Sequence, residues 1–195
     1  MLAPPPGRMM LPTDLILESE RILLRPLQRE DLSPLLELTQ DPALWTYFTH
    51  DLSTRAGLEA WAAGYFAGDR FQFVVVDQAS QQLLGSTGFG NYFPRDQRIE
   101  IGWTWLGKSA QGTGTNREMK SLMLQYAFNE LGMLRVEFKT DVLNLPARKA
   151  LLRLGATEEG ILRSHTLMTH GRRRDTIYYS FLKGEKWLTG ELINR

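Results

Sequence analysis

The chain of 195 residues contains no cysteine. A disulfide framework, a cysteine zinc site and a thiol nucleophile are therefore excluded. No apolar run approaches the roughly 18 residues that identify a membrane-spanning helix. The histidines, His50, His165 and His170, are too dispersed in the sequence to predict a metal site.

The chain also lacks a large excess of either charge, because its 23 Lys and Arg residues nearly balance its 22 Asp and Glu residues. Neither a nucleic acid nor a membrane surface is an expected partner of so balanced a chain. The length predicts a single domain over residues 15–195. The proline-rich segment 1–14 is interpreted as a flexible tail, since it lacks the long apolar run of a signal peptide. We therefore expect a cytoplasmic protein.

Hydrophobic periodicity predicts the element order βααβββαβαββ, an α+β (mixed α/β) fold with one central sheet. The expected strands cover residues 22–27, 71–77, 83–93, 98–106, 134–140, 161–168 and 174–182, and the expected helices cover 31–38, 53–68, 116–131 and 146–154. In the strand 98–106, strict alternation places Ile99, Ile101, Trp103 and Trp105 on one face and Glu100, Gly102 and Thr104 on the other.

The segment between this strand and the strongest helix carries two glycines in the run Gln111 to Thr115. Small residues allow several backbone N–H groups to point into one concavity, and the helix start adds unpaired donors and a partial positive charge. Such a loop favours phosphate oxygens, although a plain tight turn is the alternative. Thr115 and Asn116 rule out a P-loop, and Arg117 stands where a dinucleotide fingerprint needs its third glycine.

The order and spacing of four motifs extend this interpretation. They are I-L-L-R-P-L, E-I-G-W, Q-G-T-G-T-N-R-E and N-L-P-A-R-K-A-L-L-R-L-G-A, and the match spans roughly residues 20–184. On these motifs the chain resembles the GNAT superfamily of acetyltransferases, and within it the RimJ/RimL-like branch. The resemblance implies a twisted, mostly antiparallel sheet with one splayed parallel pair. It also implies acetyl-CoA as cosubstrate, without a metal.

The resemblance assigns binding roles to three segments. Residues matching the pyrophosphate loop are Gln111, Gly112, Thr113, Gly114, Thr115 and Asn116. Residues matching the strand whose splayed backbone pairs with the pantetheine arm are Trp103, Thr104, Trp105 and Leu106. In the family a bulge in this strand parts the two parallel strands. Asn144 matches an asparagine that contacts pantetheine, although a helix cap before Pro146 explains it equally well.

Two positions depart from the family pattern. Gln111 stands where an arginine is common, although Lys108 could reach the same region. Leu151 stands where many members carry the tyrosine that protonates the departing thiolate. No general acid is therefore assigned, and water or a residue from another segment has to supply that proton.

The expected reaction is direct attack of a primary amine, on a small molecule or a protein N-terminus, on the acetyl thioester. Glu100 is the candidate base, and a surface carboxylate paired with Arg98 or Arg135 is the alternative. Trp45 and Phe48 are candidates for the acceptor pocket, with simple anchoring on the core as the alternative.

Three further interpretations concern function and assembly. The cluster Arg172, Arg173 and Arg174 favours a solvated hairpin turn over contact with an acidic acceptor or RNA. A non-catalytic acyl-CoA-binding module is the competing function, and an RNA-associated protein ranks third. Exposed aromatic residues permit a homodimer.

Overall fold

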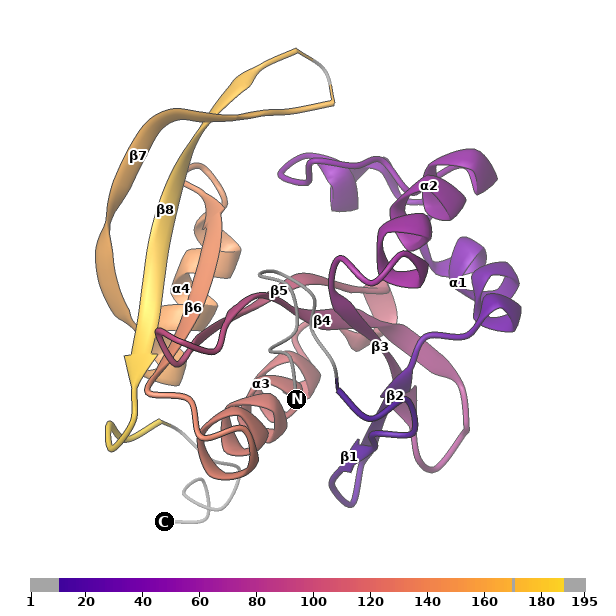
Figure 1. Cartoon of the computed structure of the whole chain (residues 1–195). Coiled ribbons are helices and arrows are strands. Elements are labelled where there is room, and N and C mark those ends of the chain that lie inside the picture. The colour runs from indigo at the N-terminus through magenta and orange to yellow at the C-terminus, as the bar shows by residue number, and fades with distance from the viewer. Residues whose placement is uncertain (1–10, 170, 188–195) are drawn as a thin grey trace.

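The computed structural model describes residues 11–169 and 171–187. Most of the predicted tail and His170 of the predicted hairpin tip lie outside these residues. In this described part of the chain, eight strands form one sheet in the order β1-β2-β3-β4-β5-β6-β8-β7, and only β5 and β6 are parallel neighbours (Figure 1). The strands are β1 (Leu17–Glu18), β2 (Ile22–Pro26), β3 (Phe71–Asp77), β4 (Leu83–Phe93), β5 (Arg98–Leu106), β6 (Arg135–Asp141), β7 (Thr157–Leu167) and β8 (Arg173–Leu182).

The described residues form four α-helices, which are α1 (Leu32–Leu38), α2 (Arg55–Phe66), α3 (Thr115–Gln125) and α4 (Leu145–Leu154). Apart from the two-residue β1, this order confirms the predicted fold class. The long helix differs in detail, because its last turn, Tyr126–Glu130, is a π-helix. No helix in the described part of the chain is long and apolar enough to cross a membrane.

The helices cover both faces of the sheet (Figure 1). One core cluster joins α3 and α4 to one face, through residues that include Met119, Met123, Leu151 and Leu154. The other cluster joins α1 and α2 to the opposite face, through residues that include Leu35, Leu58, Trp61 and Trp105. The two faces are called below the α3–α4 face and the α1–α2 face.

The parallel pair separates soon after it begins, as the resemblance implies. β5 and β6 pair at Arg98 with Arg135, at Ile99 with Val136 and at Glu100 with Glu137. Beyond these positions β6 pairs with β8 alone, from Phe138 to Asp141. The edge of β5 from residue 101 to residue 106 therefore has no strand partner on the β6 side among the strands that the structure describes.

A bulge in β5 overturns the predicted strict alternation. Trp103 and Thr104 together stand opposite Thr87, and Trp103 has φ 51°. The ring of Trp103 lies over Gly90, the residue paired with Glu100, so this ring belongs to the α1–α2 face. Because an extra residue shifts the alternation by one position, Trp103 and Trp105 leave the face that Ile99 and Ile101 occupy.

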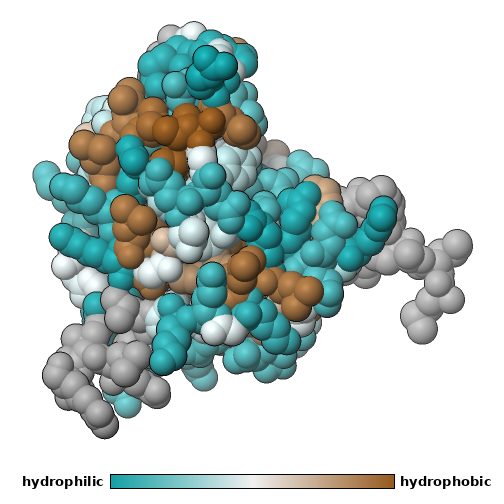
Figure 2. Space-filling model, turned by 90° about the vertical axis from the view of Figure 1, so that its left-hand side faces the viewer, coloured by the Kyte–Doolittle hydropathy of each residue, from teal (hydrophilic) through white to brown (hydrophobic). Residues whose placement is uncertain are grey.

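The edge strand β7 lies at the end of the sheet and is exposed along most of its length. Its exposed apolar side chains are Ile161, Leu162 and Leu167, and those of the α4 region are Leu143, Leu145 and Leu152. The side of the molecule that carries β7 shows apolar patches between polar side chains (Figure 2). A single chain does not test the predicted homodimer, which stays a prediction.

Candidate active site

The loop before α3 presents its backbone donors to open space. Within the described residues, the amides of residues 112–116 make no hydrogen bond, whereas that of Gln111 donates to Lys108. Gly112 and Gly114 have φ values of 76° and 93°, a region that glycine enters without steric cost. A Cβ at Gly112 would meet no atom within 4 Å. Consecutive free amides ahead of a helix form an anion site.

The side chains of this loop turn away from those amides. Gln111 donates from Nε2 to the carbonyl of Leu106 at 2.9 Å. Thr113 donates from Oγ1 to the carbonyl of Ala110 at 2.8 Å, and its hydroxyl lies 2.8 Å from that of Thr115. The loop is therefore held open by its own side chains, while its backbone stays available to a ligand.

Two arginines that the sequence analysis missed flank the loop. A Cβ at Gly114 would lie 3.7 Å from Nη1 of Arg21 and 3.8 Å from Nη2 of Arg117. Arg21 also donates to the carbonyl of Thr113 at 3.4 Å and pairs with Glu118 at 3.2 Å. These cations supply the positive charge that Gln111 lacks. Arg117 lies within the motif, and its charge next to the loop could have suggested this role, but nothing in the sequence connects Arg21 with the loop.

The strand residues assigned to pantetheine use their side chains elsewhere. Trp105 is buried in the α1–α2 core and Leu106 in the α3–α4 core. Thr104 bonds through its hydroxyl to Thr87 at 2.8 Å, and Trp103 is half-buried. Only the unpaired backbone edge of β5 is left for a ligand, which is the type of contact that the resemblance implies.

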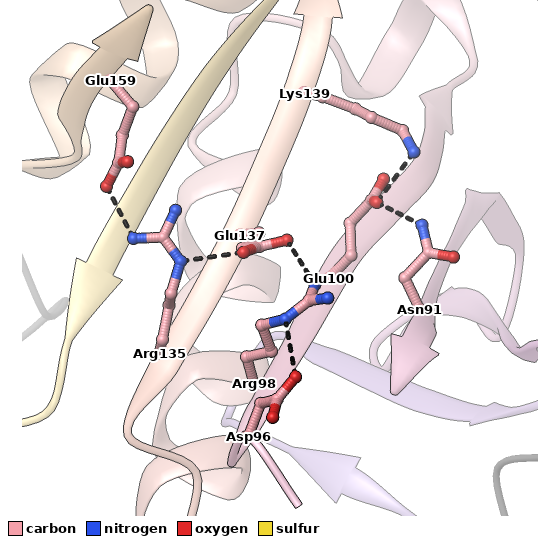
Figure 3. A network of polar contacts seen from close by, with 8 residues as sticks. All are labelled: Asn91, Asp96, Arg98, Glu100, Arg135, Glu137, Lys139 and Glu159. Atoms are coloured by element: carbon pink, nitrogen blue, oxygen red, sulfur yellow. Dashed lines mark hydrogen bonds and ion pairs between the residues drawn. The ribbon is translucent and has the colours of Figure 1, made fainter. Parts of the chain in front are cut away.

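Glu100 lies on the α1–α2 face at the last parallel pair, with 3% of its surface exposed. Its Oε2 accepts from Asn91 at 2.7 Å and pairs with Lys139 at 2.9 Å (Figure 3). Its Oε1 makes no hydrogen bond to the described residues and lies 3.0 Å from the position a Cβ on Gly102 would take. One carboxylate oxygen is thus fixed, and the other points along the strand toward the bulge.

The alternative interpretation of Glu100 as a surface carboxylate bound to an arginine is wrong. Arg98 and Arg135 bind Glu137 instead, at 3.3 Å and 2.8 Å (Figure 3). Glu137 is the register partner of Glu100 on the neighbouring strand, but the two carboxylates have different ion-pair partners. Arg135, which binds Glu137, also pairs with Glu159. Glu100 is instead buried, and its partners are the ammonium of Lys139 and the side-chain amide of Asn91.

Asn144 caps α4, as its alternative interpretation predicts. Its Oδ1 accepts from the amide of Ala147 at 3.2 Å, and its Nδ2 donates to Thr140 at 3.2 Å. The pantetheine contact stays a prediction beside this structural role.

Trp45 and Phe48 lie differently with respect to solvent. Trp45 is 2% exposed, donates from Nε1 to the carbonyl of Thr39 at 2.9 Å, and packs edge-on against Trp105. Phe48 is half-buried against Trp45, with ring centroids 5.3 Å apart. Trp45 therefore anchors the loop on the core, and of the pair only Phe48 retains surface for an acceptor.

The arginine cluster is only partly a solvated turn. Arg173 is exposed, whereas Arg174 lies 7% exposed on β8 and donates to Thr176 at 3.0 Å. Burial lowers the pKa of Arg174, and the charges of Asp141 and Glu100 oppose that shift. Arg172 binds the fully buried carboxylate of Asp141. The preference for a solvated turn is wrong for Arg174, because β8 buries this side chain.

Comparison with known proteins supports the family resemblance seen in the sequence. A family model described as an acetyltransferase (GNAT) domain matches residues 21–157. The N-acetyltransferase p20 of Bacillus licheniformis, called uncharacterized in its name, is 29% identical over 174 residues, which cover 87% of this chain and 97% of that protein. YdaF of Bacillus subtilis (strain 168), whose name provisionally calls it a ribosomal N-acetyltransferase, is 28% identical over 176 residues, covering 86% and 94%.

A solved structure of similar fold also belongs to a protein described as an N-acetyltransferase. A crystal structure of a GCN5-related N-acetyltransferase from Brucella melitensis has a TM-score of 0.83 and 29% identity, and the match covers 92% of this chain and 83% of that one. The open amide loop, the separating strands and these matches lead to one assignment: the chain belongs to the GNAT family of acetyltransferases.

Proposed function

We propose that the protein transfers the acetyl group of acetyl-CoA to a primary amine by direct attack in a ternary complex. The observation that carries this proposal is the set of amides at residues 112–116, which make no hydrogen bond to the described part of the chain. This loop follows β5, whose edge beyond Glu100 is not paired with β6. The amides and Arg21 and Arg117 suit a pyrophosphate, because both contribute positive potential at one place.

The unpaired edge of β5 suits the amide groups of a pantetheine arm, since it offers the backbone donors and acceptors of a missing strand. A backbone N–H on this edge would face the thioester carbonyl and stabilise the negative charge that its oxygen gains during attack. The cleft would supply the remaining catalysis by holding amine and thioester in contact.

Glu100 is proposed as the base, acting directly or through one water. Its Oε1 is open and points toward the bulge, while Lys139 and Asn91 hold Oε2 in place. Because Glu100 lies on the α1–α2 face, the amine would approach from that side. The half-buried ring of Phe48 is proposed as part of the acceptor surface.

The acceptor is proposed to be a protein N-terminal α-amine, with a small amine as the second choice. An attacking amine has to be neutral, which at pH 7 costs roughly 4.6 kcal/mol for a lysine of pKa ~10.4 and roughly 1.1 kcal/mol for an α-amine of pKa ~7.8. Glu100 is the one base proposed for this site, so the acceptor that costs less free energy to neutralise, the α-amine, is favoured. The name of YdaF, which refers to ribosomal N-acetylation, supports a protein acceptor. A cytoplasmic location stays a prediction.

The test combines calorimetry with acetyl-CoA and a screen for free CoA thiol. Three acceptors are compared: a peptide with a free α-amine, the same peptide with a blocked α-amine and one lysine, and a polyamine. We expect binding of acetyl-CoA and fastest thiol release with the free α-amine. Binding without thiol release for any amine would favour the non-catalytic acyl-CoA-binding module, and no binding would contradict the proposal altogether.

A further inference from the structure

Lys120 is a buried cation on α3 that the proposed reaction has not yet used. It is 7% exposed, and its ammonium lies 5.1 Å from the centroid of the Phe138 ring. Among the described residues, no carboxylate lies within ion-pair distance of this ammonium, and no oxygen accepts a hydrogen bond from it. Buried charges are normally paired, so a buried lysine without a partner among the described residues indicates a ligand that binds there.

The carboxylates on the elements around Lys120 are bound elsewhere or lie beyond pairing distance. Those with partners are Glu118 with Arg21, Asp31 with Arg25, Glu100 with Lys139, Glu137 with Arg98 and Arg135, Glu158 with Arg148, and Asp141 with Arg172. Glu18 of β1 forms no ion pair with Lys120, and the hydroxyl of Tyr179 on β8 binds Arg148 and Glu158 instead. Burial alone lowers the pKa of Lys120 from 10.5 to about 8.

The position of Lys120 connects the amide loop with the separating strands. It follows Asn116 by four residues, so both lie on the same side of the helix. Its contact, Phe138, is the first residue of β6 after the last parallel pair, Glu100 with Glu137. The ammonium therefore stands on the α3–α4 face where the two strands part, and Leu151, which replaces the expected tyrosine, belongs to the same core cluster as Phe138.

We propose that Lys120 is the general acid that protonates the departing CoA thiolate. This inference rests on the proposed function. As the amine nitrogen bonds to the acetyl carbon, the carbon–sulfur bond breaks and its electron pair stays on sulfur. A proton then moves from the Lys120 ammonium to sulfur, leaving a neutral amine that regains its proton from solvent. The proton lost by the attacking nitrogen leaves through Glu100. A lysine on α3 thus takes the role that a tyrosine at the position of Leu151 on α4 has in many family members.

The first measurement does not depend on turnover. The ultraviolet absorbance of the CoA thiolate is titrated in complexes of CoA with the wild type, Lys120→Met and, as a control, Lys149→Met, which removes an exposed lysine of α4. A cation beside the sulfur stabilises the thiolate. We expect a lower thiol pKa in the wild-type and Lys149→Met complexes than in the Lys120→Met complex.

The second measurement compares kcat with affinity across pH. We expect Lys120→Met to lower kcat about 100-fold, as loss of a general acid does, and to leave the Kd of acetyl-CoA within about threefold. The wild-type kcat should fall above about pH 8, and the variant should lose that limb. Lys120→Gln provides a second variant should Lys120→Met not fold.

Two results would overturn the assignment of Lys120. An unchanged kcat together with an unchanged thiol pKa would show that the lysine is not near the sulfur. A raised Kd with unchanged kcat would show that it anchors CoA without donating a proton. Calorimetry separates both from failure of the proposed function, in which the wild type itself would not bind acetyl-CoA and the role of Lys120 would fall with it.

Discussion

Glu100 and Glu137 face each other across the last parallel pair but differ in which oxygens are occupied. Glu137 binds one arginine through each oxygen, Arg98 through Oε2 and Arg135 through Oε1. Glu100 binds both partners through Oε2 and leaves Oε1 without a protein partner among the described residues. Only Glu100 therefore has an oxygen free to accept a proton from water or an amine.

This difference predicts that Glu100→Gln lowers kcat/KM about 100-fold, because a general base contributes at least that factor. The acid limb of the pH profile of kcat/KM should disappear with the carboxylate. Glu137→Gln removes a carboxylate at the matching register position, and its kcat/KM should stay within about threefold of the wild type. An unchanged rate and pH profile for Glu100→Gln would remove the base role, provided that acetyl-CoA still binds.

At the scale of elements, a glycine with positive φ lies in the loop before α3 and another lies just after the π-helix that follows α3, and these two glycines offer a matched test of the amide loop. Gly112 has φ 76° and Gly132 has φ 66°, and a Cβ at either would meet no atom within 4 Å. Alanine at either position should cost about 1 kcal/mol of stability through backbone strain alone.

Gly112→Ala should also weaken acetyl-CoA binding about tenfold, because the strained backbone redirects amides that are proposed to hold the pyrophosphate. Gly132→Ala should lower the melting temperature by a similar amount and leave the affinity unchanged. Calorimetry and thermal unfolding of the two variants give the comparison. Equal affinities in both variants would contradict binding through this loop.

The elements themselves were largely predictable from the residue pattern, whereas the bulge in β5 was implied only by the family resemblance. Alternation revealed β5, and Gly112 and Gly114 before an apolar stripe revealed the loop and α3. Periodicity assumes an unbroken strand, so it assigned Trp103 to the wrong face. Arg21 and Lys120 were missed because their roles depend on tertiary contacts with Gly114 and Phe138, which no local pattern encodes.

At the scale of the whole molecule, the sheet separates the two halves of the proposed reaction. The amide loop and Lys120 serve the α3–α4 face, whereas Glu100, Lys139 and Arg174 lie on the α1–α2 face. The two sets meet only where β5 and β6 part. Amine and thioester can therefore approach the gap from opposite faces and occupy it together, which is what direct attack requires.

This arrangement leaves Lys120 as a buried cation with no partner among residues 11–169 and 171–187, and the free energy that its burial costs should be measurable. The pKa of Lys120 lies near 8 in the folded chain and at 10.5 in its ordinary state. Between these values the unfolded chain binds more protons, so stability should rise with pH from about 8 to about 10.5. Below pH 8 the full penalty persists, on the order of 3 kcal/mol for a shift of this size.

Lys120→Met removes the charge and keeps an unbranched side chain over Phe138. At pH 7 the variant should melt several degrees above the wild type, since each kcal/mol shifts the melting temperature of a chain of this size by about 2–4 °C. The gap should narrow as the pH rises above 8, where the wild-type lysine loses its proton. Lys149→Met, on the exposed side of α4, should match the wild type at every pH. Scanning calorimetry of the three proteins without ligand, at pH 7 and pH 9.5, provides the measurement. A wild type as stable as Lys120→Met at pH 7 would mean that Lys120 is already compensated, and the proposed acid would then lack the lowered pKa that suits it to proton transfer near neutrality.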